Sequence, residues 1–395
     1  MLRRIALPAT AALVAAAAAV PGSAATPAPP RAAEVCAGVP APSVESAAPD
    51  TALTEDFARY ATEPTTGAGH WTGADSTYSA ELPGGDRLWI FSDTFLGQVN
   101  PDGSRSPTVG DGGTTPFLNN TFVRTRPDGD LSTITGGTEQ DPESLLPPPA
   151  ADHWYWARDG MVLDGELNVI YSEFRRTGSG SLDFAWDRNV LARFPLDGLG
   201  EPTSVTEIPS ATGISWGAWL LRDGGHTYVY GSEDLGAEKF MHVARVAGAD
   251  LQQPWEYRTA DGGWSTRESD SARIDADAGS SVLVSNEFSV ARHGDVYVLV
   301  TQELDEPFSA EIDLMFSCSP TGPFVHETTA YRTPETGATG SYGNPNVFTY
   351  NPHEHRGLGD DDELLVSYNV NSLVGSDLYA DASIYRPRFV EITLG

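Results

Sequence analysis

Basic residues, and lysine above all, are scarce in this chain of 395 residues. There are 24 Lys and Arg against 55 Asp and Glu, which gives a formal charge of −31, and Lys239 is the only lysine. Such an acidic surface repels phosphate backbones and anionic lipid headgroups. We therefore expect neither nucleic acid nor a membrane as a partner.

Long apolar runs are also missing outside the N-terminus, so the sequence predicts no transmembrane helix. The one apolar stretch, residues 5–20, follows Arg3 and Arg4 and precedes the small residues 22–25. This order is typical of a signal peptide, which we place over residues 1–25. The protein is accordingly expected to be secreted.

Cysteine is limited to Cys36 and Cys318. In an exported protein an even count favours one disulfide, which would tie the N-terminal arm to the body of the protein. A lipid anchor on Cys36 is the less favoured alternative, because the apolar run ends far upstream. Residues 26–52, rich in Pro and Ala, are predicted to be an extended linker arm, and residues 53–395 a single domain.

Helical periodicity is absent except over residues 52–61, whereas one β pattern recurs five times. Each copy has an apolar strand, a Gly/Asp turn, a second β-rich strand and a closing polar or acidic residue. The copies cover residues 74–95, 156–174, 216–234, 286–304 and 344–370. Repeats of about 69 residues with several short strands indicate blades. The sequence predicts an all-β fold, a five-bladed β-propeller, with a β-sandwich as the alternative.

In a propeller, the first residues of each innermost strand face a central tunnel. Carboxylates, amides and indoles gathered there suit a sugar, because they can bind its hydroxyls and stack on its ring. The alternative is that these side chains only satisfy buried backbone groups. The predicted substrate-binding residues are Asn120, Trp156, Arg158, Glu173, Trp216, Glu233, Glu287 and Asn346.

Three motifs near the start of the domain carry a resemblance to a known family: GAD ending in Asp75, LWIFSDTFLG around Asp93, and FLNNTF. They resemble the first blade of a family of secreted five-bladed propellers, formerly uncharacterised bacterial proteins, that includes endo-D-arabinanases. The similarity extends to SYNVNS and YRPRFVEITL and covers roughly residues 67–395. The wider architecture is similar to arabinanase- and xylosidase-type propeller glycoside hydrolases. The resemblance implies arabinan as substrate, and Asp75 and Asp93 as the catalytic residues.

The same two aspartates suit the chemistry. Cleaving a glycosidic bond needs one carboxylic acid to protonate the leaving oxygen and one carboxylate to attack or to activate water. The turn at residues 83–86 lies midway between Asp75 and Asp93, so a hairpin would pair them. Which aspartate is the acid stays open, as do endo or exo action and retention or inversion.

Other motifs indicate no metal in the active site and no required cofactor. His353-Glu354-His355 has no third ligand in view and is predicted to be a surface loop. A structural calcium ion could be held by Asp275 and Asp277 or by residues 360–362, although neither segment matches an EF-hand. The absence of G-x-S-x-G and P-loop motifs argues against an α/β-hydrolase esterase and a nucleotide enzyme.

These observations predict a secreted, monomeric glycoside hydrolase that cleaves furanose-rich polysaccharide, with arabinan as its substrate. A carbohydrate-binding propeller that acts as a lectin is the main alternative. An adhesive surface protein is a further one. The lectin would need hydrogen bonds and stacking but not a carboxylate pair.

Overall fold

The fold is built almost entirely from antiparallel strands, as the sequence predicts. The computed structural model describes residues 34–180, 183–359 and 362–395. Among these residues, no helix is both long and apolar enough to cross a membrane. The predicted signal peptide, residues 1–25, and two of the aspartates in the 360–362 run lie outside the described residues.

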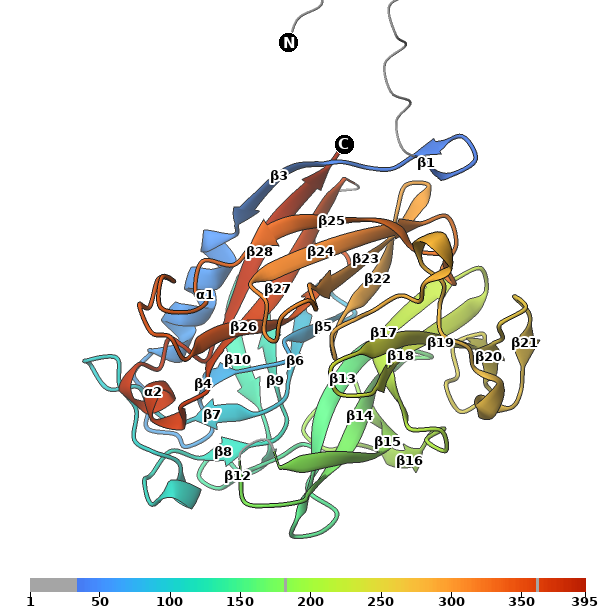
Figure 1. The fold of residues 1–395 in the computed structure, drawn as a ribbon. Coiled ribbons are helices and arrows are strands. Elements are labelled where there is room, and N and C mark those ends of the chain that lie inside the picture. Colours follow the sequence, from blue (N-terminus) through green and yellow to red (C-terminus); the bar gives the residue numbers. More distant parts are fainter. Residues whose placement is uncertain (1–33, 181–182, 360–361) are drawn as a thin grey trace, which may run out of the picture. The chain divides into compact units, whose positions relative to one another are not determined.

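Within the described residues, five sheets have four or five strands each and, apart from β3 in the last one, follow one another along the chain (Figure 1). The first sheet has β5 (Tyr78–Glu81), β6 (Arg87–Phe91), β9 (Thr121–Thr125) and β10 (Leu131–Ile134). The second has β13 (His153–Leu163), β14 (Glu166–Arg176), β15 (Phe184–Pro195) and β16 (Ser204–Glu207). The third has β17 (Ile214–Asp223), β18 (His226–Asp234), β19 (Lys239–Ala247), β20 (Glu256–Arg258) and β21 (Trp264–Ser265). The fourth has β22 (Ser289–His293), β23 (Val296–Gln302), β24 (Glu311–Ser317) and β25 (Val325–Arg332). The fifth has β26 (Val347–Glu354), β27 (Glu363–Ser372), β28 (Pro387–Leu394) and β3 (Val44–Pro49).

Smaller elements connect these sheets. Three minor sheets consist of β1 (Glu34–Cys36) with β2 (Val39–Pro40), β4 (Trp71–Ala74) with β7 (Thr94–Leu96) and β8 (Phe117–Leu118), and β11 (Gly136–Gly137) with β12 (Pro142–Glu143). The helices are α1 (Thr51–Ala61) and α2 (Gly375–Ala380), with 3-10 turns at Val109–Asp111, Glu268–Asp270 and Asp277–Gly279.

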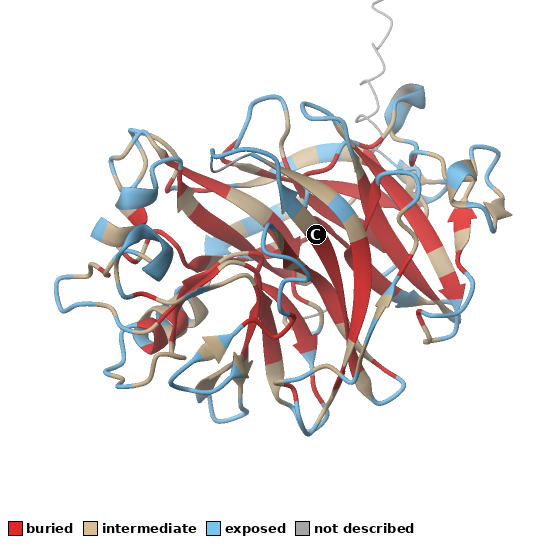
Figure 2. Cartoon of the chain, turned by 90° about the horizontal axis from the view of Figure 1, so that it is seen from below, coloured by how far each residue is buried: buried red, intermediate tan, exposed pale blue. Residues whose placement is uncertain are grey.

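The inner strands of the five sheets are buried on both faces, whereas outer strands such as β16 and β25 alternate between half-buried and exposed residues. All seven residues of β23 are buried, for example. The largest core cluster takes side chains from the first four sheets, including Tyr78, Leu167, Trp219 and Val290. Figure 2 shows the result, with buried strands and exposed connecting loops.

The innermost strands of the sheets contact one another in series. β13 contacts both β5 and β17, β17 contacts β22, and β22 contacts β26. The last strand returns to the first: the ring of His353 in β26 is hydrogen bonded to the carbonyl of Thr77, and that of His355 to the hydroxyl of Ser79 in β5. Both histidines are completely buried, so the predicted surface loop is wrong. The two histidines are separated by one residue, so a strand places both on the same face, and here that face is buried.

The two ends of the described chain meet in the fifth sheet. β3 pairs with β28, so residues 44–49 of the predicted linker arm form an edge strand instead. Val44 and Ala47 of β3 pack on the core of the last sheets, which is why this segment is ordered. The predicted helix is confirmed as α1, where the side chain of Asp50 accepts a hydrogen bond from the N–H of Leu53.

The predicted disulfide is confirmed and joins Cys36 in β1 to Cys318 just after β24. It closes a chain segment of 282 residues. Such a bond stabilises the fold mainly by restricting the unfolded chain, and long closed segments gain most. The N-terminal segment is thus held twice, by this bond and by β3.

Replacing both cysteines, as Cys36→Ser with Cys318→Ser, is expected to lower the free energy of unfolding by about 2–4 kcal/mol, because the unfolded chain regains its freedom. Urea denaturation followed by tryptophan fluorescence measures this. The native protein in reducing agent should match the double variant. Equal stability of the oxidised native protein and the variant would contradict the prediction.

Candidate active site

Asp75 and Asp93 lie side by side, as the hairpin predicts. Asp75 follows β4 and Asp93 precedes β7, and these strands are antiparallel partners. The N–H of Asp75 donates to the carbonyl of Asp93 at 3.3 Å, and the N–H of Ser92 donates to the carbonyl of Asp75 at 3.0 Å. The main chain therefore places the two carboxyl groups next to each other.

The side chain of Asp75 is held by two tyrosines from the fifth sheet and its approach. The hydroxyls of Tyr350 and Tyr385 donate to Oδ2 at 2.6 Å and 2.8 Å. Oδ1 is buried and accepts no hydrogen bond from the described residues. Burial raises the pKa of Asp75 to about 6, although the two phenol hydrogen bonds oppose the rise.

Asp93 has a different pair of donors. The side-chain amide of Asn119 and the indole N–H of Trp156 donate to Oδ1 at 2.8 Å and 2.7 Å. Burial, and after it the negative charge of Asp75, raises the pKa of Asp93 to about 7. Two neighbouring carboxyl groups in one site cannot both ionise easily, so the pair titrates as a unit and retains a proton at higher pH than an isolated aspartate does.

A third carboxyl group, Glu287, lies directly behind the pair. Its Oε1 accepts a hydrogen bond from Ser76 at 2.7 Å, and its Oε2 lies 3.7 Å from Nδ1 of His353. Burial raises the pKa of Glu287 to about 8, against the opposing charge of Arg158. Arg158 is also buried and donates to the hydroxyls of Ser172 and Ser215 and to a main-chain carbonyl.

The backbone is strained at the two residues that directly follow Asp75. Ser76 and Thr77 have φ values of 68° and 60°, in the left-handed region that such residues rarely adopt. Each costs on the order of 1–3 kcal/mol and persists only where surrounding contacts impose it. Those contacts are the bond from Ser76 to Glu287 and one from the amide of Asn369 to the hydroxyl of Thr77.

Several predicted binding residues are engaged elsewhere. Glu173 is fully buried and bound to Arg188, His153 and Tyr155, and Glu233 pairs with Arg273. None of these contacts links either glutamate to Asp75 or Asp93. Trp156 and Glu287, by contrast, are brought to the carboxylate pair, with Arg158 beside Glu287.

The structure places three further predicted residues away from the carboxylate pair. Trp216 has no exposed surface and lies in a hydrophobic core, where its ring cannot meet a sugar. Asn120 is buried and binds main-chain groups of Leu146 and Tyr155, whereas its neighbour Asn119 points to Asp93. Asn346 receives a main-chain bond from Leu373 beside α2 and makes no described contact with the carboxylate pair.

The sequence offered little signal for the tyrosines. Tyr350 lies in the middle of β26, and Tyr385 lies two residues before β28. They are 275 and 310 residues from Asp75 along the chain. Local patterns cannot predict contacts at such separations.

One group of possible metal ligands occurs among the described residues: His153, Glu173 and Asp187, with ligand atoms within 4.8 Å of one another. The guanidinium of Arg188 donates to Glu173 at 2.7 Å within this group. A cation thus already pairs with the central carboxylate, whose pKa is lowered by Arg188 and His153 despite its burial. The group is an ion-pair cluster.

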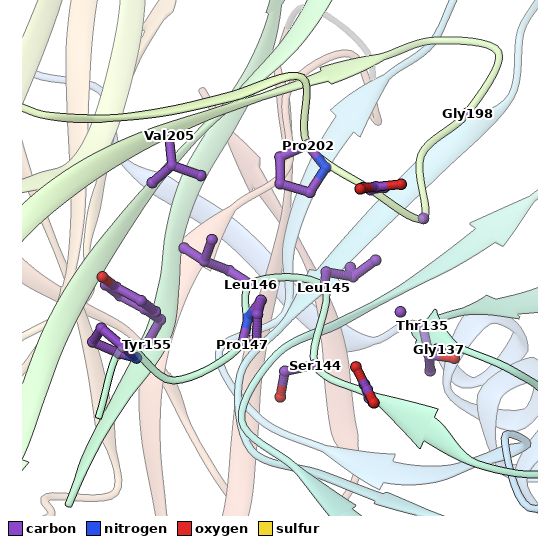
Figure 3. A pocket seen from close by; sticks show the side chains of 15 residues that line it. Thr135, Gly137, Ser144, Leu145, Leu146, Pro147, Tyr155, Gly198, Pro202 and Val205 are labelled. Carbon is purple, nitrogen blue, oxygen red and sulfur yellow. The ribbon is translucent and has the colours of Figure 1, made fainter. Parts of the chain in front are cut away.

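A cavity of about 860 Å³ lies on the other face of β13 from the carboxylate pair. Figure 3 shows its lining, which includes Leu145, Leu146, Pro147, Tyr155 and Val205. Tyr155 points into it while Trp156, the next residue of the strand, turns to Asp93. The cavity is therefore separate from the carboxylate site.

Comparison with known proteins gives a family and a fold. Residues 55–393 match the family model described as "Domain of unknown function (DUF5005)". No curated protein matches the chain. A solved structure from Bacteroides ovatus, provisionally classed as a hydrolase, superposes with a TM-score of 0.72 at 22% identity, covering 88% of this chain and 90% of that one. A GH43_1 enzyme from Xanthomonas citri has a TM-score of 0.48 at 15% identity, covering 86% and 93%. The first superposition shows a shared fold.

The raised pKa of Asp93 makes a prediction for stability. With a pKa of about 7 folded and 3.8 unfolded, this group stabilises the fold below pH 4, and that contribution is lost as the pH rises to 7. Asp93→Asn keeps the Oδ1 acceptor without the charge. It should raise the melting temperature at pH 8 by at least about 2 °C, with little gain at pH 4.

The control for this measurement is Asp261→Asn. Asp261 is exposed, and bonds from the Thr259 hydroxyl and the Gly263 N–H lower its pKa. Its substitution should give no gain at pH 8. Differential scanning calorimetry between pH 4 and pH 8 tests both variants, and an equal gain for Asp93→Asn at the two pH values would contradict the shift.

Proposed function

Since the chain belongs to the family described as a domain of unknown function (DUF5005), we propose its activity from its own site: it is a secreted glycoside hydrolase that cleaves furanose-rich polysaccharide, with arabinan as substrate. One observation carries this proposal. Asp75 and Asp93 are paired side by side, and burial raises the pKa of each into the range where one is protonated and the other ionised near neutral pH.

We propose separate roles for the two aspartates from their contacts. Asp93, with the higher pKa, is the general acid that protonates the leaving glycosidic oxygen. Asp75 is the carboxylate that attacks the anomeric carbon or takes a proton from the attacking water. In either case one water molecule is consumed and its hydroxyl ends on the anomeric carbon. If Asp75 attacks, Asp93 recovers its proton from that water in the second step. If Asp75 is the base, it takes the proton of the water and releases it to solvent, from which Asp93 is protonated again.

Tyr350 and Tyr385 support the ionised form of Asp75. Burial and the charge of Asp75 hold the pKa of both tyrosines well above its ordinary value, so both remain donors. Their hydrogen bonds stabilise the carboxylate against burial. Their position also orients Oδ2, which leaves Oδ1 without a partner among the described residues.

We further infer that the five large sheets are the blades of the predicted propeller. The support is the series of contacts through β5, β13, β17, β22 and β26, which returns to β5 through two buried histidines. The pairing of β3 with β28 joins the two ends within one sheet, as closure of a propeller requires. The carboxylate pair then lies where the first and last blades meet.

Arabinan as the polymer rests on the resemblance of GAD, LWIFSDTFLG and FLNNTF to the arabinanase-containing propeller family. These motifs contain Asp75, Asp93 and Asn119, three residues that the structure brings into one group. Export is supported by the disulfide between Cys36 and Cys318, since such bonds persist in oxidising compartments.

Product analysis on a polysaccharide panel tests the proposal. The panel contains mycobacterial arabinogalactan, plant arabinan, levan and galactofuranan. Arabinan-containing polymer should be cleaved, and Asp75→Asn and Asp93→Asn should each lower kcat by at least about 10²–10⁴-fold while the fold persists. Asp261→Asn is the matched control and should retain full activity. Retention of one polymer on a column without cleavage would favour the lectin.

The pH dependence of kcat/KM tests the assignment of roles. We expect a bell-shaped profile with its optimum between about 6 and 7, set by Asp75 and Asp93. Tyr350→Phe removes a hydrogen bond that lowers the pKa of Asp75. Its acidic limb should therefore move to higher pH while the alkaline limb stays. Movement of the alkaline limb alone would reverse the two roles.

A further inference from the structure

Two groups of aromatic rings lie outside every hydrophobic core of the described residues, and each reaches one of the paired aspartates. The second-sheet platform, as we call the first group, consists of Trp154, Trp156, Phe174 and Phe184. The fifth-sheet platform consists of Phe308, Phe348 and Tyr350. Trp154 and Phe348 are buried, Phe308 is exposed, and the other rings are half-buried, so each group presents part of its apolar surface outside the cores.

The second-sheet platform is a continuous group of rings beside Asp93. The ring centroid of Trp156 lies 4.6 Å from that of Phe174 and 5.0 Å from that of Phe184. All three residues are only half-buried. Trp156 also donates its indole N–H to Asp93 at 2.7 Å, which fixes the platform against the general acid.

The fifth-sheet platform lies beside Asp75 in the same manner. The centroids of Phe308 and Phe348 are 4.1 Å apart, and those of Phe348 and Tyr350 are 5.3 Å apart. Tyr350 donates its hydroxyl to Asp75 at 2.6 Å. Phe308 is 38% exposed and has a φ of 57°, so the chain accepts backbone strain at the residue that presents this ring.

We infer that the two platforms are sugar-stacking subsites on opposite sides of the carboxylate pair, so that a linear furanose polysaccharide crosses the site and is cleaved within the chain. The inference rests on the proposed function. Trp156 contacts Asp93 and Tyr350 contacts Asp75, so each platform reaches a different member of the pair, and a sugar chain laid across the pair would meet both. Aromatic faces stack on the C–H surface of sugar rings. The packing of the rings against one another fixes their orientation before the sugar binds, which lowers the entropic cost of binding.

The peripheral rings allow a test that spares the catalytic contacts. Phe184→Ala and Phe308→Ala remove one ring from each platform but leave Trp156 and Tyr350 in place. Each is expected to lower kcat/KM on a linear arabinofuranose octasaccharide on the order of tenfold. With the substrate labelled at its reducing end, the preferred cleavage position should shift in opposite directions for the two variants.

Leucine variants and a control at a distant site distinguish the loss of a ring from unfolding of the protein. Phe184→Leu and Phe308→Leu keep apolar volume without a ring and should reproduce the loss. Trp264→Ala removes a half-buried ring on the edge strand β21, over which Arg245 lies at 3.9 Å, and should leave the cleavage position unchanged. A shift in the same direction for both platform variants, or none in either, would overturn the two-sided arrangement.

Calorimetric binding of the same octasaccharide to Asp75→Asn, with and without each platform substitution, separates this inference from the proposed function. If the native protein cleaves no polymer but the platform substitutions weaken binding, the subsites stand and hydrolysis fails. If the native protein cleaves and the variants bind and cleave as it does, hydrolysis stands and the subsites fail. Absence of both binding and cleavage would overturn both.

Discussion

The site depends on two main-chain hydrogen bonds, from Asp75 to the carbonyl of Asp93 and from Ser92 to the carbonyl of Asp75. They extend the pairing of β4 with β7 and force two carboxyl groups into one half-buried space. Two neighbouring carboxylates repel each other, so ionising both costs free energy and the pair retains a proton. Burial, and after it the charge of Asp75, raises the pKa of Asp93, whereas two phenol donors oppose the effect of burial on Asp75.

The same region contains local strain. Ser76 and Thr77 adopt positive φ values directly after Asp75, and buried atoms of Asp75, Glu287 and His353 lack hydrogen-bond partners among the described residues. Each of these features costs stability. The surrounding sheets, with their apolar strands buried on both faces, offset that cost. Stability and the carboxylate chemistry are therefore opposed at this point of the chain, and the rest of the fold supports the chemistry.

How far the sequence predicts this structure depends on the range of each interaction. The pairing of Asp75 with Asp93 follows from one short turn, and α1 follows from its apolar spacing and the cap at Asp50, so local rules suffice. Asn120 is the asparagine that the sequence predicts as a binding residue, whereas its neighbour Asn119 contacts Asp93. The motif alone does not tell which of the two asparagines reaches the carboxylate pair. Trp216 is of a residue type that often binds sugars, but it is buried in a hydrophobic core that its local sequence does not predict. No local pattern could bring Tyr350 and Tyr385 to Asp75.

The position of those tyrosines links the closing of the fold to the chemistry. Asp75 belongs to the first sheet's approach, whereas its two donors come from the last sheet and its approach. A Cβ at Gly73 would overlap the carbonyl oxygen of Tyr385, so only glycine allows β4 to lie this close to that segment. Phe57 of α1 packs between Trp71 and Phe389 and holds the same junction from behind. The contacts between the first and the last parts of the fold thus include those that stabilise the charge of the proposed base.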